Sequence, residues 1–372
     1  MQKLDLLLVY DLFASFSKFE KYGLISRVID QHSIYAKRFR HVAIQSIDDT
    51  SYDSVLPRNV SHLTFPRVPF KQLIYFLFSG LLYYQKYSPK IVEVCHVTGI
   101  IPALPYKLRG SKFALDFNWD FAASIRDLKG NYWGLFAKWL QILSFKMADI
   151  IFAATPLLVD EAKKYIPKEK IILLPNYVDT DLFSPQKLTA SHCAFSFKIV
   201  FIGRLHEQKN LAMLFKVMEQ LPQYSLSIIG DGPMRNELND IKNNLNLGNI
   251  ELIGSVRNEE LPMYLSKANA FILISHREGH PKALIEAMSC GLPCIGSNVN
   301  GIKDVIIDGK TGFLCENDIN SIKECILNAF GTPSKMKSVG LSARQFVIDN
   351  YSKDAILKKK IDSLHQLTSG TF

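Results

Sequence analysis

The chain has 372 residues, more than twice a typical domain of about 150, so two domains are expected. Hydrophobic residues make up 48% and charged residues 21%, which excludes a disordered chain, a coiled coil and a collagen-like fibre. The net charge is +9, and residues 1–190 hold +7 of it. Such a basic half favours an anionic partner: a lipid surface, a phosphate-bearing substrate or a nucleic acid.

Short apolar runs alternate with stretches of helical periodicity along the whole chain, for example a helix over 133–147. The runs that predict strands are 4–10, 41–46, 91–96, 112–117, 149–154, 170–175, 197–203, 225–230, 249–254, 270–275 and 292–297. Because they are apolar throughout, they are typical of parallel strands covered on both faces. The sequence therefore predicts an α/β protein with two doubly wound, Rossmann-like domains.

The two sets of strands are separated by a segment rich in Ser, Pro and Thr at 183–197. We place the domains at 1–185 and 186–345 on this basis. The last segment, about 341–367, is predicted to be a helix with Lys358, Lys359 and Lys360 exposed.

The longest apolar run covers residues 73–84 and is too short for a membrane span of about 20 residues. Arg67 and Lys71 precede it, and Lys86 and Lys90 follow it. Two interpretations remain open: a core helix, or a helix that lies on a membrane surface. The N-terminus lacks the pattern of a signal peptide, so we expect a soluble or membrane-surface protein.

Several motifs are absent from the sequence. It has no GxxxxGK[ST], no GxGxxG after the first strand, and neither GxSxG nor HExxH. No helix-turn-helix or zinc-finger signature accompanies the positive charge, so nucleic acid is not expected as a partner. The six cysteines lack CxxC pairing, which indicates buried thiols in a reducing cytosol and no zinc site.

A first candidate motif, GRLHEQKN at 203–210, directly follows a predicted strand. Gly203 allows a sharp turn at the carboxyl end of this strand, where doubly wound sheets bind ligands. Arg204 and Lys209 would then extend from one loop, and this pair suits a diphosphate. The alternative is two solvated surface cations.

A second motif, SHREGHPKALIEAMSCGLP at 275–293, predicts a strand end, a turn and a short helix with Pro281 in its first turn. The amino end of such a helix attracts anions. Glu278 and Glu286 would repel a phosphate but could accept hydrogen bonds from hydroxyls of a sugar and a ribose. Alternatively, both are ordinary acids at a helix end and on a helix surface.

Taken in order and spacing, these motifs, with GDGP (230–233), IGSV (253–256) and NGIKDVIIDGKTGF (300–313), resemble the donor-binding domain of glycosyltransferase family 4. The match covers about 148–315, and EGHPKALIE corresponds to the family's E-x7-E motif. The resemblance implies the GT-B fold, with two Rossmann-like domains facing each other across a cleft. It also implies an acceptor-binding domain at 1–185, a donor-binding domain at 186–345, and a helix at 346–372 that packs back on the first.

The resemblance assigns roles to residues of this chain. Arg204, Lys209 and Glu278 become the catalytic candidates: the two cations would hold the donor diphosphate, and Glu278 the sugar hydroxyls. Glu286 would bind the ribose. The other donor-binding candidates are Gly203, Ser255, Val256, Gly279, His280, Pro281, Lys282, Ala283 and Leu284.

The chain departs from the family pattern on the acceptor side. The loop that begins at Asp11 lacks the usual Gly-Gly, and Asn118 stands at or near a usual histidine. Asp11 and Asn118 are therefore only acceptor-side candidates. Asp179-Thr180-Asp181 resembles the D-x-D of metal-dependent transferases, but we interpret it as structural.

The implied function is a retaining, metal-independent hexosyltransferase without a cofactor. It would move a hexosyl group from a nucleotide sugar, such as a UDP-sugar, to a hydroxyl of a glycan or lipid-linked glycan acceptor in bacterial surface polysaccharide or lipopolysaccharide synthesis. The expected location is the cytoplasm, with peripheral attachment to the anionic inner face of the membrane. A nucleotide-sugar epimerase and a non-catalytic sugar-nucleotide-binding relative remain alternatives.

Overall fold

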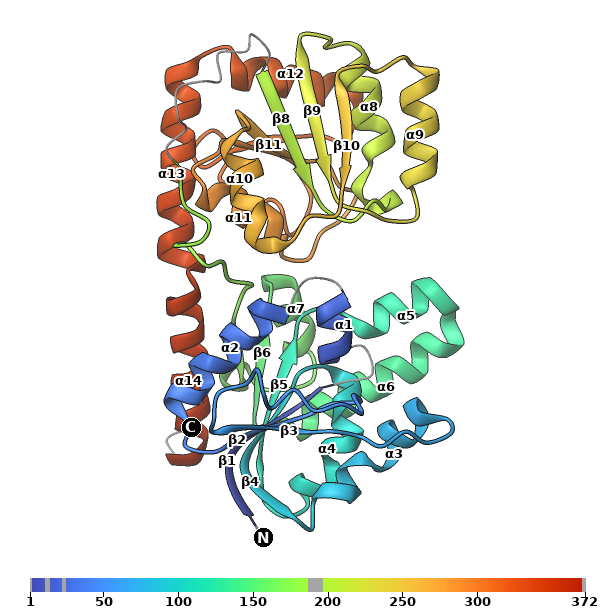
Figure 1. Cartoon of the computed structure of the whole chain (residues 1–372), viewed down its shortest axis with the longest axis vertical. Coiled ribbons are helices and arrows are strands. Elements are labelled where there is room, and N and C mark those ends of the chain that lie inside the picture. Colours follow the sequence, from blue (N-terminus) through green and yellow to red (C-terminus); the bar gives the residue numbers. More distant parts are fainter. Residues whose placement is uncertain (1, 11–13, 22–24, 187–196, 370–372) are drawn as a thin grey trace. The chain divides into compact units, whose positions relative to one another are not determined.

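A computed structural model describes residues 2–10, 14–21, 25–186 and 197–369 of the chain. The chain divides into two compact units (Figure 1). Unit 1 comprises Met1–Pro175 and Leu357–Phe372, and unit 2 comprises Asn176–Ile356. No described helix is long and apolar enough to cross a membrane.

Unit 1 is built on a seven-stranded parallel sheet with the order β3-β2-β1-β4-β5-β6-β7. Its strands are β1 (Gln2–Val9), β2 (Val42–Gln45), β3 (Val60–Leu63), β4 (Tyr87–Val94), β5 (Lys112–Phe117), β6 (Ile150–Ala153) and β7 (Ile171–Leu173). The chain runs outward from β1 to β3 and then returns to the other side of β1 as β4. The strand order therefore reverses between β1 and β4, the position where doubly wound sheets bind ligands.

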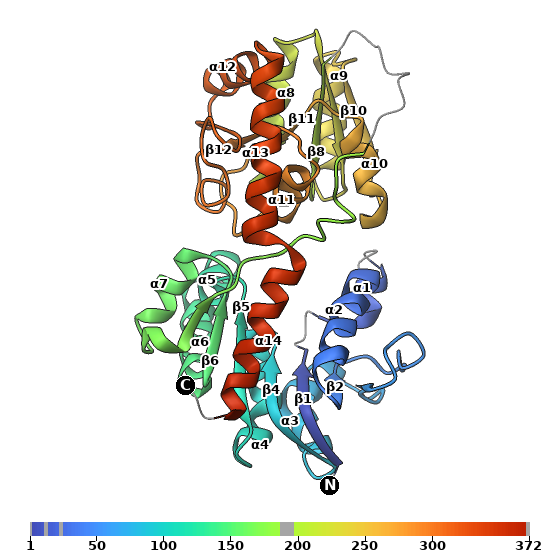
Figure 2. The ribbon, with the colours of Figure 1, turned by 90° about the vertical axis from the view of Figure 1, so that its left-hand side faces the viewer.

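Helices cover both faces of this sheet (Figures 1 and 2). They are α1 (Phe16–Lys21), α2 (Ile25–Arg38), α3 (Lys71–Tyr83), α4 (Ile100–Lys107), α5 (Phe121–Lys129), α6 (Asn131–Met147), α7 (Pro156–Lys163) and most of α14 (Lys353–Ser369), with 3-10 turns η1 (Val97–Gly99) and η2 (Lys168–Lys170). Val92 and Val94 of β4 pack with α4 and α6, whereas Glu93 between them contacts α2 and α14. This alternation places α4 and α6 on one face and α2 and α14 on the other.

Unit 2 contains a six-stranded parallel sheet with the order β10-β9-β8-β11-β12-β13. Its strands are β8 (Phe197–Ile202), β9 (Tyr224–Ile229), β10 (Ile250–Gly254), β11 (Ala270–Leu273), β12 (Cys294–Ser297) and β13 (Phe313–Cys315). Its helices are α8 (Leu211–Glu219), α9 (Arg235–Asn244), α10 (Leu261–Ser266), α11 (Lys282–Ser289), α12 (Ile319–Phe330) and α13 (Pro333–Tyr351), with η3 (Glu207–Lys209) and η4 (Asn258–Glu260). Here the order reverses between β8 and β11.

The two predicted doubly wound sheets are present, and each of the eleven predicted strands overlaps an observed one. Two strands were not predicted: β3, whose sequence VSHL interrupts the apolar run with Ser and His, and β13, whose three apolar residues stand between Gly312 and Glu316. The predicted helix over 341–367 is wrong as a single helix, because Ser352 has an extended backbone and separates α13 from α14.

The units divide at Pro175 and Ile356, about ten residues from the expected 185 and 345. The segment after Asn176 belongs to unit 2 because it is tied to the end of α13. The Val178 amide donates to the Tyr351 carbonyl at 2.9 Å, and the Lys353 amide donates to the Val178 carbonyl at 2.8 Å.

The prediction that Lys360 is exposed is wrong. Its side chain is only 5% exposed, whereas Lys358 and Lys359 do lie at the surface. The ammonium group of Lys360 lies 2.7 Å from Glu93 and 2.8 Å from Asp116, so α14 is fixed to β4 and β5 by buried ion pairs. A run of three lysines predicts a solvated face. Successive residues of a helix point about 100° apart, so Lys360 faces the sheet while Lys358 and Lys359 face solvent.

Candidate active site

The candidate site lies in unit 2 at the carboxyl ends of β8 and β11. These two strands are neighbours in the sheet but are far apart in the chain. The loop after β8 carries Arg204 and Lys209, and the loop after β11 carries Glu278. Because the strand order reverses here, both loops leave the same point of the sheet edge and frame a natural binding position.

Lys209 and Glu278 form the central pair of the site. The Lys209 ammonium lies 2.5 Å from a Glu278 carboxylate oxygen, and their side chains are 17% and 7% exposed. The same oxygen accepts a hydrogen bond from the Ser275 hydroxyl at 2.7 Å. Glu278 is thereby held in one orientation, while the ammonium keeps further protons for another partner. A charged pair this little exposed is more costly to separate than a surface pair.

Hydrogen bonds hold the two loops to each other. The Gln208 side chain donates to the Arg277 carbonyl at 2.7 Å, and the His276 amide donates to the Gln208 carbonyl at 2.9 Å. Asn317, two residues after β13, also holds this loop, since its side chain donates to the Ser275 carbonyl at 3.0 Å. The position of Glu278 is therefore set before any ligand arrives, which is the condition for selective recognition.

Glycines permit unusually close backbone packing around these loops. Gly301 has φ +83°, and a Cβ atom there would lie 2.1 Å from the Gly279 carbonyl oxygen. Gly230 has φ +139°, and a Cβ atom there would lie 1.9 Å from the Gly203 carbonyl oxygen. Any side chain at these positions would displace the loops that carry Lys209 and Glu278.

Helix α11 begins directly after the Glu278 loop. It starts at Lys282, so Pro281 is its N-cap and not, as expected, part of its first turn. The first turn contains no acidic residue. The Leu284 and Ile285 amides donate to the Pro281 carbonyl at 3.2 and 3.3 Å, and the amides at the start of a helix point outward along its axis. An eight-residue helix that points its amino end at this edge favours a negatively charged group there.

His280 is buried in the turn before α11 and is only 8% exposed. Its ring packs edge-on against Tyr351 at 4.9 Å, and neither ring nitrogen has a hydrogen-bond partner among the described residues. Burial, with a smaller contribution from Lys282, lowers the pKa of His280 to about 4, so the ring is neutral at pH 7. The Asn176 side chain donates to the His280 carbonyl at 2.7 Å and holds this turn in place.

Glu286 lies in the second turn of α11 and is 4% exposed. The Asn258 side chain donates to its carboxylate at 3.4 Å. Asn258 follows Ser255 and Val256, which come directly after β10; Ser255 is exposed and Val256 half-buried. The contact thus joins the segment expected to line the nucleotide base with the acid expected to bind the ribose.

The remaining predicted donor residues differ in exposure. Arg204 follows Gly203 at the end of β8 and has an exposed side chain, and Gly279 and Lys282 are exposed as well. Ala283 is half-buried, and Leu284 is fully buried in the core of unit 2. Leu284 therefore supports the helix, and its side chain does not face a ligand.

Sequence reasoning missed Asn176, Asn258 and Asn317, which hold the turn before α11, the Glu286 carboxylate and the loop after β11. Asn176 was within reach, because it lies inside the range 148–315 that resembles the family. Asn258 and Asn317 have no motif around them, and only the folded chain brings them to the site.

On the acceptor side, Asn118 follows β5 and its side chain is exposed. Asp11 lies outside the described residues. His96, which the sequence analysis did not select, follows β4 at the point where the strand order of unit 1 reverses. It is 5% exposed, its side chain accepts from the Thr98 amide, and its ring stacks on Trp119 with centroids 4.9 Å apart.

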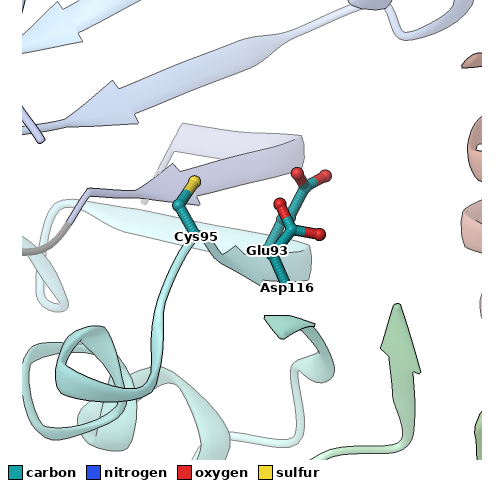
Figure 3. A group of neighbouring side chains, drawn as sticks. All are labelled: Glu93, Cys95 and Asp116. Atoms are coloured by element: carbon teal, nitrogen blue, oxygen red, sulfur yellow. The ribbon is translucent and has the colours of Figure 1, made fainter. Parts of the chain in front are cut away.

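Within the described residues, the one group of side chains close enough to share a metal ion is Glu93, Cys95 and Asp116 in unit 1. Figure 3 shows these side chains extending from β4, the residue after it and β5. The ammonium of Lys360 already occupies the space between the two carboxylates. Tyr35 donates to Glu93 at 3.0 Å, so the acids are satisfied by protein groups and do not fit a metal centre.

Asp179, the first acid of the D-x-D sequence, has a structural environment. Its carboxylate accepts hydrogen bonds from the amides of Asp181 and Leu182 at 3.1 Å and pairs with Lys353 at 2.5 Å. Burial alone would raise the pKa of Asp179, but these donors, Lys353 above all, lower it below the ordinary value. The residue caps a turn and ties it to α14.

Residues 196–346 match the family model described as Glycosyl transferases group 1. Over these residues the chain is similar to the group 1 glycosyltransferases. The family resemblance drawn from the motifs is thereby confirmed, and the match spans Lys209, Glu278 and Glu286.

Named relatives agree with this family. The chain is 28% identical over 293 residues to UDP-Gal:alpha-D-GlcNAc-diphosphoundecaprenol alpha-1,3-galactosyltransferase of Escherichia coli, with 73% of this chain and 72% of that protein covered. It is 31% identical over 189 residues to the O-antigen biosynthesis glycosyltransferase WbnH of Escherichia coli, covering 50% and 52% of the two chains. Only about half of WbnH is therefore matched.

Solved structures confirm the fold. Sucrose-phosphate synthase from Thermosynechococcus elongatus superposes with a TM-score of 0.81 at 18% identity over 100% of both chains. HepE from Anabaena, solved with UDP and glucose, superposes with a TM-score of 0.76 at 16% identity over 97% of this chain and 99% of that chain. The glycosyltransferase GT-B fold predicted from the sequence is thus confirmed.

Proposed function

We propose that this glycosyltransferase transfers a hexosyl group from a nucleoside diphosphate sugar with retention of anomeric configuration and without a metal ion. The observation that carries the proposal is the Lys209–Glu278 pair beside the amino end of α11. It joins groups for two kinds of ligand: cations and helix amides for a diphosphate, and a fixed carboxylate for sugar hydroxyls.

Bond cleavage between the sugar and the diphosphate places negative charge on the leaving group. Lys209, Arg204 and the first-turn amides of α11 are the groups that would stabilise this charge, which is the task of a metal ion in other transferases. The Lys209 ammonium has three N–H donors, so it can donate one hydrogen bond to Glu278 and another to the diphosphate.

The sugar and nucleoside would be held by the two acids. Glu278 is oriented by Ser275 and Lys209 and would accept hydrogen bonds from sugar hydroxyls. Glu286, with Asn258 beside it, would accept from the ribose, while Ser255 and Val256 line the base. The acceptor hydroxyl would attack from the face that the diphosphate leaves, and a phosphate oxygen would take its proton.

For the acceptor, we propose a hydroxyl of a lipid-linked glycan in bacterial surface polysaccharide synthesis. Relatives named for a diphosphoundecaprenol-linked acceptor and for O-antigen biosynthesis support this class. A location on the cytoplasmic side of the membrane, as a peripheral protein, would follow from such an acceptor.

The test has two stages. First, UDP, GDP and their sugars are screened for a rise in melting temperature, because a ligand that binds the native state stabilises it. The sugar that binds is then incubated with a diphosphate-lipid-linked N-acetylglucosamine acceptor in excess EDTA, and the product linkage is determined by NMR. Transfer with an inverted anomeric centre, or transfer abolished by EDTA and restored by Mn²⁺, would refute the mechanism.

A further inference from the structure

Helix α6 of unit 1 presents aromatic side chains to solvent. Trp133, Phe136 and Trp139 are 58%, 52% and 57% exposed, and Tyr132 and Leu135 are 90% and 71% exposed. Their spacing of three and four residues forms one stripe on the helix. Neighbouring rings touch, with centroids 6.5 Å apart for Trp133–Phe136 and 6.0 Å for Phe136–Trp139.

Helix α3 presents a second apolar stripe. Leu73, Leu77, Phe78, Leu81 and Leu82 are between 44% and 58% exposed, again at helical spacing. The first interpretation of the run 73–84, a core helix, does not describe α3, because one side of it is exposed. The second interpretation, a helix that lies on a membrane surface, stays a prediction. One side of α3 packs closely on α4, and the other is open to solvent.

The two stripes belong to the same side of unit 1. Gly80 of α3 packs so closely that a Cβ atom there would lie 1.9 Å from the Pro102 carbonyl oxygen of α4. Ser144 of α6 donates to the carbonyl of Val97 in η1, immediately before α4, at 3.2 Å. Helices α3 and α6 therefore flank α4 over one face of the sheet, away from α2 and α14 (Figures 1 and 2).

The segment of the chain that contains α3 and α6 carries a net positive charge. Residues 65–146, which contain α3 and all of α6 but its last residue, hold 11 Lys and Arg and four Asp and Glu. Five of these cations pair with acids outside the segment: Arg67 and Lys71 with Asp49, Lys90 with Asp5, Lys107 with Asp149, and Lys138 with Glu161. Two of the four acids, Glu93 and Asp116, are occupied by Lys360 on the other face of the sheet. This segment accounts for the whole +7 of residues 1–190.

We propose that the outer faces of α3 and α6 form one docking surface for an anionic lipid bilayer, with the aromatic and leucine side chains entering the interface and the surrounding cations contacting headgroups. Trp and Tyr are the residues that favour the membrane–water boundary. Apolar burial and attraction to anionic lipid add in such binding. Lys129 lies 5.9 Å over the Trp133 ring, so cation and aromatic ring meet at the edge of the stripe.

This inference rests on the proposed function in one respect: a lipid-linked acceptor would give such a surface its purpose. The partner chosen is lipid and not a second copy, because a second copy would bring the same positive charge to the contact, whereas an anionic bilayer neutralises it.

The experiment measures co-sedimentation of the full chain with vesicles of phosphatidylglycerol and phosphatidylcholine, and of phosphatidylcholine alone, at low salt. We expect binding to the mixed vesicles, little binding to the neutral ones, and weakening when salt shortens the screening length below about 8 Å. The triple variants Trp133→Ser/Phe136→Ser/Trp139→Ser and Leu77→Ser/Phe78→Ser/Leu81→Ser should each reduce binding at least about tenfold. Leu341→Ser, at a 59% exposed leucine of α13, is the matched control and should bind like wild type.

Equal binding by the variants and wild type, or no binding to anionic vesicles, would overturn the proposal. So would a concentration-dependent dimer in gel filtration that the α6 variant abolishes without any vesicle binding by wild type. Transfer to a short water-soluble acceptor separates this test from the proposed function. If docking fails alone, wild type and variants still transfer equally; if the proposed function fails, no transfer occurs but vesicle binding is still measured.

Discussion

The two units place their charged side chains in opposite ways. In unit 2, Lys209 and Glu278 meet at the sheet edge on loops after neighbouring strands, and first-turn amides of α11 lie beside them. In unit 1, Lys360, Glu93 and Asp116 meet on a sheet face, beneath helices, and satisfy one another. The first arrangement keeps donors for a ligand, and the second leaves none. Charged side chains at the carboxyl edge of a sheet indicate a binding site. Charged side chains buried between a sheet and a helix indicate an ion pair that stabilises the fold.

The largest effect is expected on the stability of unit 1, when the buried ion pairs of Lys360 are removed. Lys360→Met removes the ammonium and leaves two buried carboxylates facing each other, which costs about 3–5 kcal/mol. Differential scanning calorimetry should show the melting transition of unit 1 falling by many degrees, while that of unit 2, followed with a bound nucleoside diphosphate, stays unchanged.

Lys358→Met is the matched control, because Lys358 lies on the same helix but is exposed. It should change the free energy of unfolding by less than about 0.5 kcal/mol. If Lys360→Met were equally harmless, the ion pairs would contribute nothing, and the contrast between the units would be lost.

This contrast also explains what could be predicted from the sequence. The site of unit 2 is carried by short segments such as 203–210 and 275–293, where turn glycines, a helix start and charged residues stand together. The strands of both sheets were visible because their apolar runs are continuous. β3 and β13 were not visible, because Ser61 and His62 interrupt the apolar run of β3 and the apolar run of β13 is only FLC.

The Lys360 cluster could not be predicted, because its members stand at positions 93, 116 and 360 and only the closed fold joins them. Nothing local distinguishes Lys360 from Lys358 and Lys359. The same limit applies to Asn258 and Asn317, whose partners in the site lie 28 and 42 residues away.

The next largest effect is a difference between the two units in how their stability changes with pH. Burial lowers the pKa of His280 in unit 2 to about 4, from an ordinary 6.5. The unfolded chain therefore binds the proton more readily, and stability is lost as the pH falls from about 6.5 towards 4, by about 3 kcal/mol in all. His32 in unit 1 has the same shift, also caused mainly by burial.

Unit 1 contains an opposing group. Burial, together with the Glu93 carboxylate and against the attraction of Lys360, raises the pKa of Asp116 to about 7. The folded state then binds this proton more readily, so acidification from pH 7 to 4 stabilises unit 1 and offsets His32. Thermal scans at pH 7, 5.5 and 4.5 should show unit 2 losing more than unit 1, and His280→Leu should flatten the decline of unit 2. Parallel declines would contradict the assignment.

Removing a cation from the edge should reduce activity and leave stability nearly intact. Arg204→Ala and Lys209→Ala are each expected to lower kcat/KM by about tenfold to a hundredfold, since a charge-assisted hydrogen bond contributes about 1.5–3 kcal/mol. Lys216→Ala, at an exposed lysine on α8, is the control and should retain full activity. Near wild-type turnover in both Arg204→Ala and Lys209→Ala would contradict the assignment of these two residues to binding the diphosphate.

The smallest effect is expected at Asn258, which contacts Glu286 at 3.4 Å. Asn258→Ala should weaken nucleotide binding about threefold, because one long hydrogen bond to a carboxylate is lost. Isothermal titration calorimetry with the nucleoside diphosphate would measure this, with Asn243→Ala on the exposed side of α9 as the comparison. A loss beyond thirtyfold would mean that Asn258 contacts the ligand directly.

Unit 1 is formed by two separate segments of the chain, and this affects its folding during synthesis. Its first 175 residues leave the ribosome early, but Lys360 follows only after residues 176–356 have been translated. At roughly 5–20 residues per second, that interval lasts about 10–40 s. Throughout it, Glu93 and Asp116 have no ammonium between them, so the part synthesised first is completed last. Nascent chains should therefore depend on chaperones most while unit 2 is emerging.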